Sequence, residues 1–288
     1  MLSRLFKGLT NRQPASRIAF DRTGEYVPGC PKGIFTINPD GTDLRQIRIS
    51  GEAPRWSPDG RLIAFIENTE DNGWLSSVFV MRPDGQNVRR LTFHHDVSAT
   101  PATWSPDSRQ LAYSLWLWQE KKYQLCIVEL ASTRSRSLLF SEDEIYPVWT
   151  PANKIVFNQY GASGGSRLHD VDPANPQLRP CAPFEPGDTE PVWSYDGGKV
   201  IFGRDGGMVV MNSDGSEPET IRFERQPIQW AISPDGLNIA YTCQEVRGAG
   251  FEVFVLSLSD GSKRRLVANP IIKNKEVDSR YVSWSPWL

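Results

Sequence analysis

Two short stretches contain residue types that catalysis or metal binding requires. Residues 161–165 read Gly-Ala-Ser-Gly-Gly and match the G-x-S-x-G pattern, in which a serine such as Ser163 attacks an acyl group from a tight strand-to-helix turn. His94, His95 and Asp96 are consecutive and offer nitrogen and oxygen ligands for a metal ion. Each chemistry needs partner side chains that converge from elsewhere in the fold.

The surrounding sequence favours a simpler interpretation of both stretches. Ser163 lies between two strand-like segments, KIVFNQY and SRLHDVD, so it belongs to a hairpin tip. In the second segment His169 and Asp170 are adjacent and would point to opposite faces of a strand. His169 is also the one other histidine, whereas a first-row metal site usually takes three or four convergent ligands. We therefore expect no catalysis, no metal and no cofactor, with His94 and His95 as loop residues that can contact a partner.

Carboxylates form two further groups. The first group consists of Asp-Gly pairs that lack the alternating oxygen ligands and distal glutamate of a calcium loop, so we expect hairpin turns: Asp40, Asp84, Asp214 and Asp260. The second group lies near the starts of the strands that we expect to be innermost: Glu52, Glu144, Glu190 and Asp278. This second group predicts either an acidic channel mouth for a cation or a basic peptide, or ordinary solvated loop charge.

The elements that position these residues come from a repeated unit. The stretch RWSPDGRLIAF (55–65) returns in related form as TWSPDSRQLAY (103–113), VWSYDGGKVIF (192–202) and AISPDGLNIAY (231–241). The Pro-Asp-Gly sequence favours a tight turn, and an apolar strand follows it. Such units recur 39 to 52 residues apart, a period typical of propeller blades, and their markers are Trp56, Trp104, Trp149, Trp193, Ile232 and Trp284.

Each unit continues with a third strand, a second turn and a fourth strand, as in VFVM, RPDGQN and RRLTF between residues 78 and 93. A sheet of this kind cannot bury both of its faces alone, so the units must stack around an axis with each Trp between neighbouring blades. Arg89-Arg90 and Lys263-Arg264-Arg265 lie on fourth strands, where charge protects an outer edge from pairing with another chain.

The two ends of the chain complete one unit. YVSWSPWL (281–288) supplies a first strand with its Trp, whereas RIAF (17–20) begins with a second strand and GIFTINPDGTDLRQI (33–47) supplies the third and fourth. We therefore predict an all-β fold, a six-bladed β-propeller of four-stranded antiparallel blades over residues 17–288, with one blade closed by the N- and C-terminal segments. Residues 1–16 form a tail. A β-sandwich or two smaller β domains would be the alternative, which the uninterrupted period disfavours.

Composition limits the partners and the cellular compartment that we expect for the protein. A net charge of −2 gives no electrostatic footprint for nucleic acid. No stretch is long and apolar enough to span a membrane, the start does not read as a secretory signal, and the four cysteines are scattered, so we expect a reduced, cytoplasmic protein. In residues 1–12 the apolar side chains have helical spacing, which would allow a weak peripheral contact with a membrane or a partner; a disordered tail or a strap on the propeller is the alternative.

The stretch PRWSPDGRLIAF, followed by VFVMRPDGQNVRRLT, resembles the WD-like β-propeller repeat of the TolB family. The likeness covers roughly residues 17–288. The resemblance implies the fold and is a poor guide to function, because the same propeller occurs in transport-associated scaffolds and in serine peptidases. The α/β domain and signal peptide of TolB proper, and the hydrolase domain of the peptidases, are not seen in this sequence. The resemblance therefore implies a stand-alone propeller that is used for binding.

We predict a non-catalytic protein–protein interaction module. Short turns join strands one to two and three to four on one face, and the long loops between strands two and three and between blades lie on the other, the long-loop face, where binding is more common. The candidate partner-binding residues on that face are Trp74, Leu75, Trp116, Trp118, His94 and His95. The LWLW run could instead lengthen a hairpin and cover its neighbour. The alternative function is a small-ligand or cation binder, or a hydrolase-like enzyme, that uses the central channel.

Overall fold

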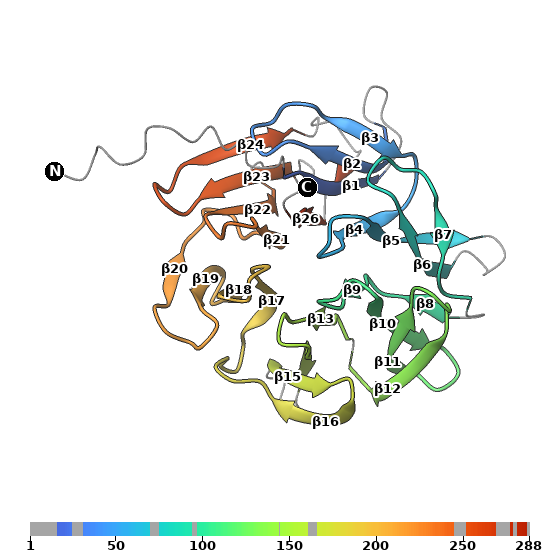
Figure 1. Cartoon of the computed structure of the whole chain (residues 1–288). Helices are drawn as coiled ribbons and strands as arrows, with labels where there is room; N and C mark the ends of the chain where they lie inside the picture. Colours follow the sequence, from blue (N-terminus) through green and yellow to red (C-terminus); the bar gives the residue numbers. More distant parts are fainter. Residues whose placement is uncertain are drawn as a thin grey trace.

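The computed structural model describes residues 16–24, 31–69, 75–93, 97–143, 145–160, 166–244, 252–268, 277–278 and 281–286. Within these ranges the regular elements are 26 strands, arranged in six antiparallel sheets. Figure 1 shows the sheets set radially around a central axis, like the blades of a propeller. The predicted six-bladed, all-β fold is confirmed.

The strands follow the blades in chain order, and we number the blades from the one that contains the first strand. Blade 1 contains β1 (Ile18–Gly24), β2 (Gly33–Ile37), β3 (Arg45–Arg48), β25 (Val277–Asp278) and β26 (Val282–Trp284). Blade 2 contains β4 (Glu52–Trp56), β5 (Ile63–Thr69), β6 (Leu75–Met81) and β7 (Arg89–Arg90). Blade 3 contains β8 (Val97–Ala99), β9 (Thr103–Trp104), β10 (Gln110–Leu117), β11 (Lys122–Glu129) and β12 (Ser135–Ser141).

The remaining three blades each have four strands within the described residues. Blade 4 contains β13 (Val148–Trp149), β14 (Ile155–Tyr160), β15 (Ser166–Asp172) and β16 (Asn175–Pro180). Blade 5 contains β17 (Thr189–Trp193), β18 (Lys199–Arg204), β19 (Gly207–Asn212) and β20 (Glu219–Ile221). Blade 6 contains β21 (Gln229–Ile232), β22 (Asn238–Cys243), β23 (Glu252–Ser257) and β24 (Lys263–Val267).

Blade 1 closes the ring by joining the two ends of the chain, as the sequence predicts. Strand β26 pairs antiparallel with β1, so that Ile18 lies opposite Trp284 and Phe20 opposite Val282. The backbone N–H of Arg17 also donates to the Ser285 hydroxyl at 2.7 Å. Because β26 is the innermost strand of the blade, the C-terminal segment forms part of the channel wall (Figure 1).

A serine and an aspartate fix the turn that begins each of four blades. In blade 2 the Ser57 hydroxyl donates to Asp59 Oδ1 at 2.6 Å and accepts the N–H of Leu62 at 3.0 Å. The same pair of bonds recurs at Ser105, Ser194 and Ser233. The Asp-Gly turns use the simpler form in which the aspartate accepts a backbone N–H two residues on, at Asp40, Asp84, Asp214 and Asp260. Both sets are hairpin turns, as predicted.

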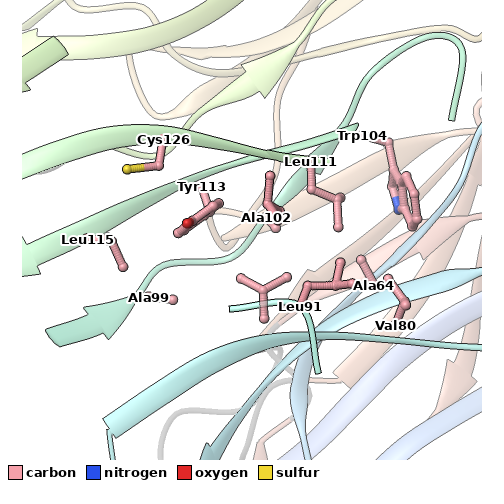
Figure 2. Packing of buried hydrophobic residues seen from close by; sticks show 12 residues of the cluster. Ala64, Val80, Leu91, Ala99, Ala102, Trp104, Leu111, Tyr113, Leu115 and Cys126 are labelled. Carbon is pink, nitrogen blue, oxygen red and sulfur yellow. The ribbon is translucent and has the colours of Figure 1, made fainter. Parts of the chain in front are cut away.

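The core lies between blades, and the marker tryptophans are part of it. Trp104 of blade 3 packs in one buried cluster with Ala64 and Val80 of blade 2, as Figure 2 shows. Cys126 and Tyr113 of blade 3 belong to the same interface. This arrangement confirms that the repeated Trp lies between neighbouring blades. In blade 6 the marker is Ile232, and Trp230 two residues earlier packs in the same cluster.

Charged and sulfur-containing residues also lie where the pattern places them. The outermost strands β7 and β24 contain Arg89, Arg90 and Lys263-Arg264-Arg265. Cys126 and Cys243 are buried, and Cys181 is half-buried. Within the described ranges no helix is long and apolar enough to cross a membrane.

Candidate functional site

The innermost strands of the six blades enclose a cavity of about 610 Å³ along the central channel. At one end its wall includes residues at the starts of these strands, such as Tyr146 and Tyr281 on the long-loop face. At the other end it includes the prolines of the short turns, such as Pro58 and Pro106. Six tryptophans contribute to the wall, one from each blade: Trp56, Trp104, Trp149, Trp193, Trp230 and Trp284. The cavity is therefore mainly apolar and aromatic.

Arg55 on β4 is the one cationic side chain among the described residues that line this cavity. Its Nη1 donates to the carbonyl oxygens of Val282 at 3.1 Å and Pro54 at 3.4 Å, and its Nη2 donates to Gln229 Oε1 at 3.2 Å. The guanidinium also lies 5.6 Å from the centre of the Tyr281 ring. Burial lowers the pKa of Arg55, because removing a charge from water disfavours the charged form.

Gln229 connects Arg55 to Glu190 across the channel. Its Nε2 donates to Glu190 Oε2 at 3.2 Å, so one amide links a cation on blade 2 to a carboxylate on blade 5. The Glu190 carboxylate lines the channel, where loss of hydration raises its pKa to about 7. The positive charge of Arg55 only partly offsets this effect. Near neutral pH this carboxylate is therefore partly protonated.

An irregularity in the backbone directs Glu190 into the channel. The register of β17 against β18 shifts between Thr189 and Val192, and Glu190 has a positive φ of 51° immediately before Pro191. Its carbonyl oxygen accepts the indole N–H of Trp230 at 3.1 Å. A β-bulge of this kind redirects a side chain and is common beside functional sites. The bulge and its hydrogen bond thus place the carboxylate beside Gln229.

Blade 2 repeats this irregularity with a different stabilising group. The register of β4 shifts between Glu52 and Arg55, and Ala53 has a φ of 52° before Pro54. The N–H of Ala53 donates to the buried Asp21 carboxylate at 2.9 Å, and the N–H of Tyr281 donates to the same carboxylate at 3.1 Å. Asp21 therefore holds together the backbone of β4, which contains Arg55, and the segment before β26, which contains Tyr281.

The four carboxylates predicted at the channel mouth have different outcomes. Glu190 lines the cavity, whereas Glu52 is the exposed first residue of β4 and is not among the lining residues. Glu144 lies outside the described residues. Asp278 pairs through its backbone with Thr23 of β1, and its side chain lies outside the described part of the chain. The polar groups that the structure brings together are Glu190 and the unpredicted Arg55, Gln229 and Tyr281.

The predicted partner-binding residues lie partly within the described ranges. Trp116 is half-buried on β10. The centre of its ring lies 4.7 Å from the ring centre of Tyr123 and 6.0 Å from that of Trp118. Trp118, in the loop after β10, has 57% of its surface exposed. Leu75 is the half-buried first residue of β6. Trp74, His94 and His95 lie outside the described residues.

Exposed large apolar side chains differ between the two faces, whereas exposed Phe140 and Leu178 lie on the outermost strands β12 and β16. The long-loop face presents aromatic Phe93, Trp118 and Tyr146, which belong to the consecutive blades 2, 3 and 4, together with Ile49. The short-turn face presents only aliphatic side chains among the described residues, namely Leu44, Val88 and Leu237. Tyr146 also lines the cavity, so the aromatic surface continues into the channel.

The other residues with catalytic potential do not converge in the described part of the chain. His169 and Asp170 are neighbours on β15, where Asp170 is buried and pairs with Lys154 at 3.1 Å. The serine motif at residues 161–165 lies outside the described residues. The described His, Cys, Asp and Glu residues form no group of three that could hold a metal ion. Burial raises the pKa of the thiols, to about 12 for Cys126 and about 11 for Cys181, which disfavours the nucleophilic thiolate.

Sequence reasoning missed the polar cluster because its members come from four blades. Arg55 immediately precedes the marker Trp56, and Gln229 and Tyr281 each lie three residues before the marker of their unit. All three residues lie on or next to the innermost strand of their blade, and these innermost strands supply the cavity wall. A comparison of the polar residues on the first strand of every unit would have found them as candidates.

Comparisons with known proteins agree on the fold. A family model described as the TolB beta propeller domain matches residues 63–276. The chain is 43% identical over 75 residues to the Tol-Pal system protein TolB 1 of Novosphingobium aromaticivorans, and 28% identical over 143 residues to a TolB homolog of Chlorobium chlorochromatii. These matches cover 25% and 50% of this chain but only 16% and 31% of the relatives. The crystal structure of TolB from Acinetobacter baumannii superposes with a TM-score of 0.74 at 16% identity, over 94% of this chain and 67% of that one.

Proposed function

We propose that the chain, which belongs to the TolB beta propeller domain family, is a non-catalytic module that binds a protein partner on its long-loop face. A shared propeller fold does not by itself specify one reaction. The blades provide a rigid support, since buried apolar clusters join blades 1 and 2, 2 and 3, 3 and 4, 5 and 6, and 6 and 1. On such a support the connecting loops determine what is bound.

The distribution of exposed aromatic side chains is the observation that carries this proposal. Phe93 and Trp118 expose 59% and 57% of their surfaces on the long-loop face, and Tyr146 exposes 49% at the channel mouth. Large exposed aromatic residues are unfavourable in water and are enriched among the residues that dominate binding energy at protein interfaces. A partner that covers the surface of blades 2 to 4 would bury these three side chains together.

Two further features support a binding role in a reducing compartment such as the cytoplasm. The thiols of Cys126 and Cys181 are protonated at neutral pH because burial raises their pKa, so neither is poised as a nucleophile. Cys126 and Cys181 are free thiols, as is usual where thiols are kept reduced. The aromatic and proline-rich channel wall also suits binding better than it suits acid–base chemistry.

Affinity capture with matched variants tests this proposal. Trp118→Ala removes an exposed aromatic side chain from the long-loop face, and Leu237→Ala removes an apolar side chain of similar exposure, 54%, from the opposite face. We expect Trp118→Ala to weaken capture of the partner at least tenfold and Leu237→Ala to leave it unchanged, with melting temperatures near that of the parent chain. Equal capture by all three proteins, or loss of capture only with Leu237→Ala, would contradict the proposal.

A further inference from the structure

The Arg55 guanidinium is a half-buried cation in the channel wall that makes no ion pair among the described residues. Its three hydrogen bonds go to two backbone carbonyls and one neutral amide. A charge held away from water is costly unless an opposite charge lies beside it. Glu190 is separated from Arg55 by the Gln229 side chain. The structure thus keeps a positive charge in the channel wall that the described protein does not neutralise by direct contact.

The hydrogen bonds of Arg55 leave two N–H donors of the guanidinium unused among the described residues. Nη1 uses both of its hydrogens, on Pro54 and Val282, whereas Nη2 uses one, on Gln229. No described acceptor takes the Nε hydrogen or the second Nη2 hydrogen. A carboxylate is the acceptor that guanidinium donors bind most strongly. Because Arg55 lines the cavity, a ligand in the channel can reach this group.

We propose that the channel binds an apolar or aromatic molecule with a single carboxylate, which pairs with Arg55 while the body of the molecule packs on the aromatic and proline walls. The cavity volume of about 610 Å³ lies within the range that holds small organic ligands. The Tyr281 ring beneath the guanidinium and the Gln229 amide beside it restrict how the carboxylate can approach. A planar, bidentate partner fits this geometry better than a compact anion such as chloride.

The charges around the site are compatible with an anionic ligand below neutral pH. Glu190 is the nearest cavity-lining carboxylate, and its pKa of about 7 means that it is mostly neutral at pH 6. The other ionisable groups that act on Arg55 are Asp21, Tyr195 and Tyr281. Burial raises the pKa of both tyrosines, so they remain neutral. Asp21 accepts the backbone N–H groups of Ala53 and Tyr281, and its carboxylate is the remaining negative charge that acts on Arg55.

This inference goes beyond the proposed function, because a ligand in the channel requires no protein partner. The carboxylate could belong to a free acid or to the C-terminus of a peptide. Calorimetric titration at pH 6 with benzoate and indole-3-acetate, and with short peptides ending in Phe or Trp, distinguishes these sources. The neutral amide of each acid and the amidated form of each peptide serve as probes of the same shape without the charge.

We expect at least one acid or peptide to bind tenfold or more tightly than its own amide. In the same titration Arg55→Met should lose this preference, Arg55→Lys should keep part of it, and Arg61→Met, which changes an exposed arginine in the turn after β4, should bind as the parent does. Equal affinity of every acid and its amide for the parent chain would overturn the proposal, and this comparison does not depend on the folding of any variant. An acid preference that survives in folded Arg55→Met would also overturn it.

Discussion

At the scale of single residues, the channel depends on two backbone positions that the sequence pattern does not reveal. Ala53 and Glu190 both precede a proline and both have a positive φ, a conformation unfavourable for residues other than glycine. The buried Asp21 carboxylate stabilises the first, and the Trp230 indole stabilises the second. The repeat predicts a strand at both places, and only contacts with distant residues account for the bulge. Glu190 could be assigned to the mouth because it lies near the start of a first strand. Gln229 and Arg55 could not be assigned as its neighbours, because these contacts join residues of different blades.

Replacing Asp21 by Ala should destabilise the fold strongly. The change leaves the buried N–H groups of Ala53 and Tyr281 without their acceptor, and each lost hydrogen bond to a charged group costs about 1.5–3 kcal/mol. We expect a loss of about 3 kcal/mol or more in the free energy of unfolding, measured by urea denaturation. The exposed Asp84→Ala serves as the control. A cost no larger than that of the control would show that Asp21 does not fix this part of the backbone.

Glu190 should make the stability of the protein depend on pH between its ordinary pKa of 4.5 and its folded pKa of about 7. Its folded pKa is raised to about 7, so the folded state favours the protonated form, and the contribution of this group is lost as the pH rises through 7. Glu190→Gln cannot ionise. We expect the melting temperature of the parent to fall relative to that of Glu190→Gln as the pH rises from 5 to 8. A difference in melting temperature between the two proteins that stays constant across this pH range would contradict the assigned pKa.

At the scale of elements, the turn that opens a blade was predictable because all of its determinants are local. Ser105 and Asp107 contact each other and the backbone within five residues. Blade 4 shows how far the motif can change, since Thr150 replaces the serine and accepts the N–H of Lys154 at 3.2 Å. The bulges could not be predicted in this way, because their hydrogen-bond partners lie on other blades.

These turns should weaken in acid. The serine hydroxyl holds the pKa of Asp107 and of Asp196 below the usual value, so their stabilising effect is present at neutral pH and is lost as the pH falls through the folded pKa. Ser105→Ala and Ser194→Ala each remove such a bond, and we expect each to cost about 1 kcal/mol at pH 7. Urea denaturation should show that the cost shrinks toward pH 2. A cost that is equal at both pH values would argue against the role of the carboxylates.

At the scale of the whole molecule, closure of the ring was predictable because the two chain ends are complementary parts of one unit. Strand β26 supplies the inner strand of blade 1, and Trp284 packs against blade 6 through Ala231 and Val255. The same strand supplies the Val282 carbonyl that Arg55 contacts. Ring closure thus completes both the core and the channel wall, although the contact of Arg55 with a residue 227 positions away could not be read from either segment.

A chain that ends at residue 280 should lose this closure. It would lack the pairing of β26 with β1 and the buried Trp284, and an open sheet edge promotes association with other chains. We expect aggregation or a loss of several kcal/mol, because deleting a single large core side chain already costs about 3–5 kcal/mol. A chain that ends at residue 286 is the control. Equal solubility and melting temperature of the two truncated chains would contradict the closure of blade 1 by the C-terminal strand.

The central claim is that a protein partner binds the long-loop face, and photo-crosslinking in cells of the native organism tests it most directly. A photoreactive phenylalanine derivative is placed at Trp118 on that face in one chain and at Leu237 on the opposite face in another, since the two side chains are similarly exposed. The account predicts that position 118 forms a discrete crosslinked product with one protein and that position 237 does not. The same product from both positions, or from position 237 alone, would contradict it.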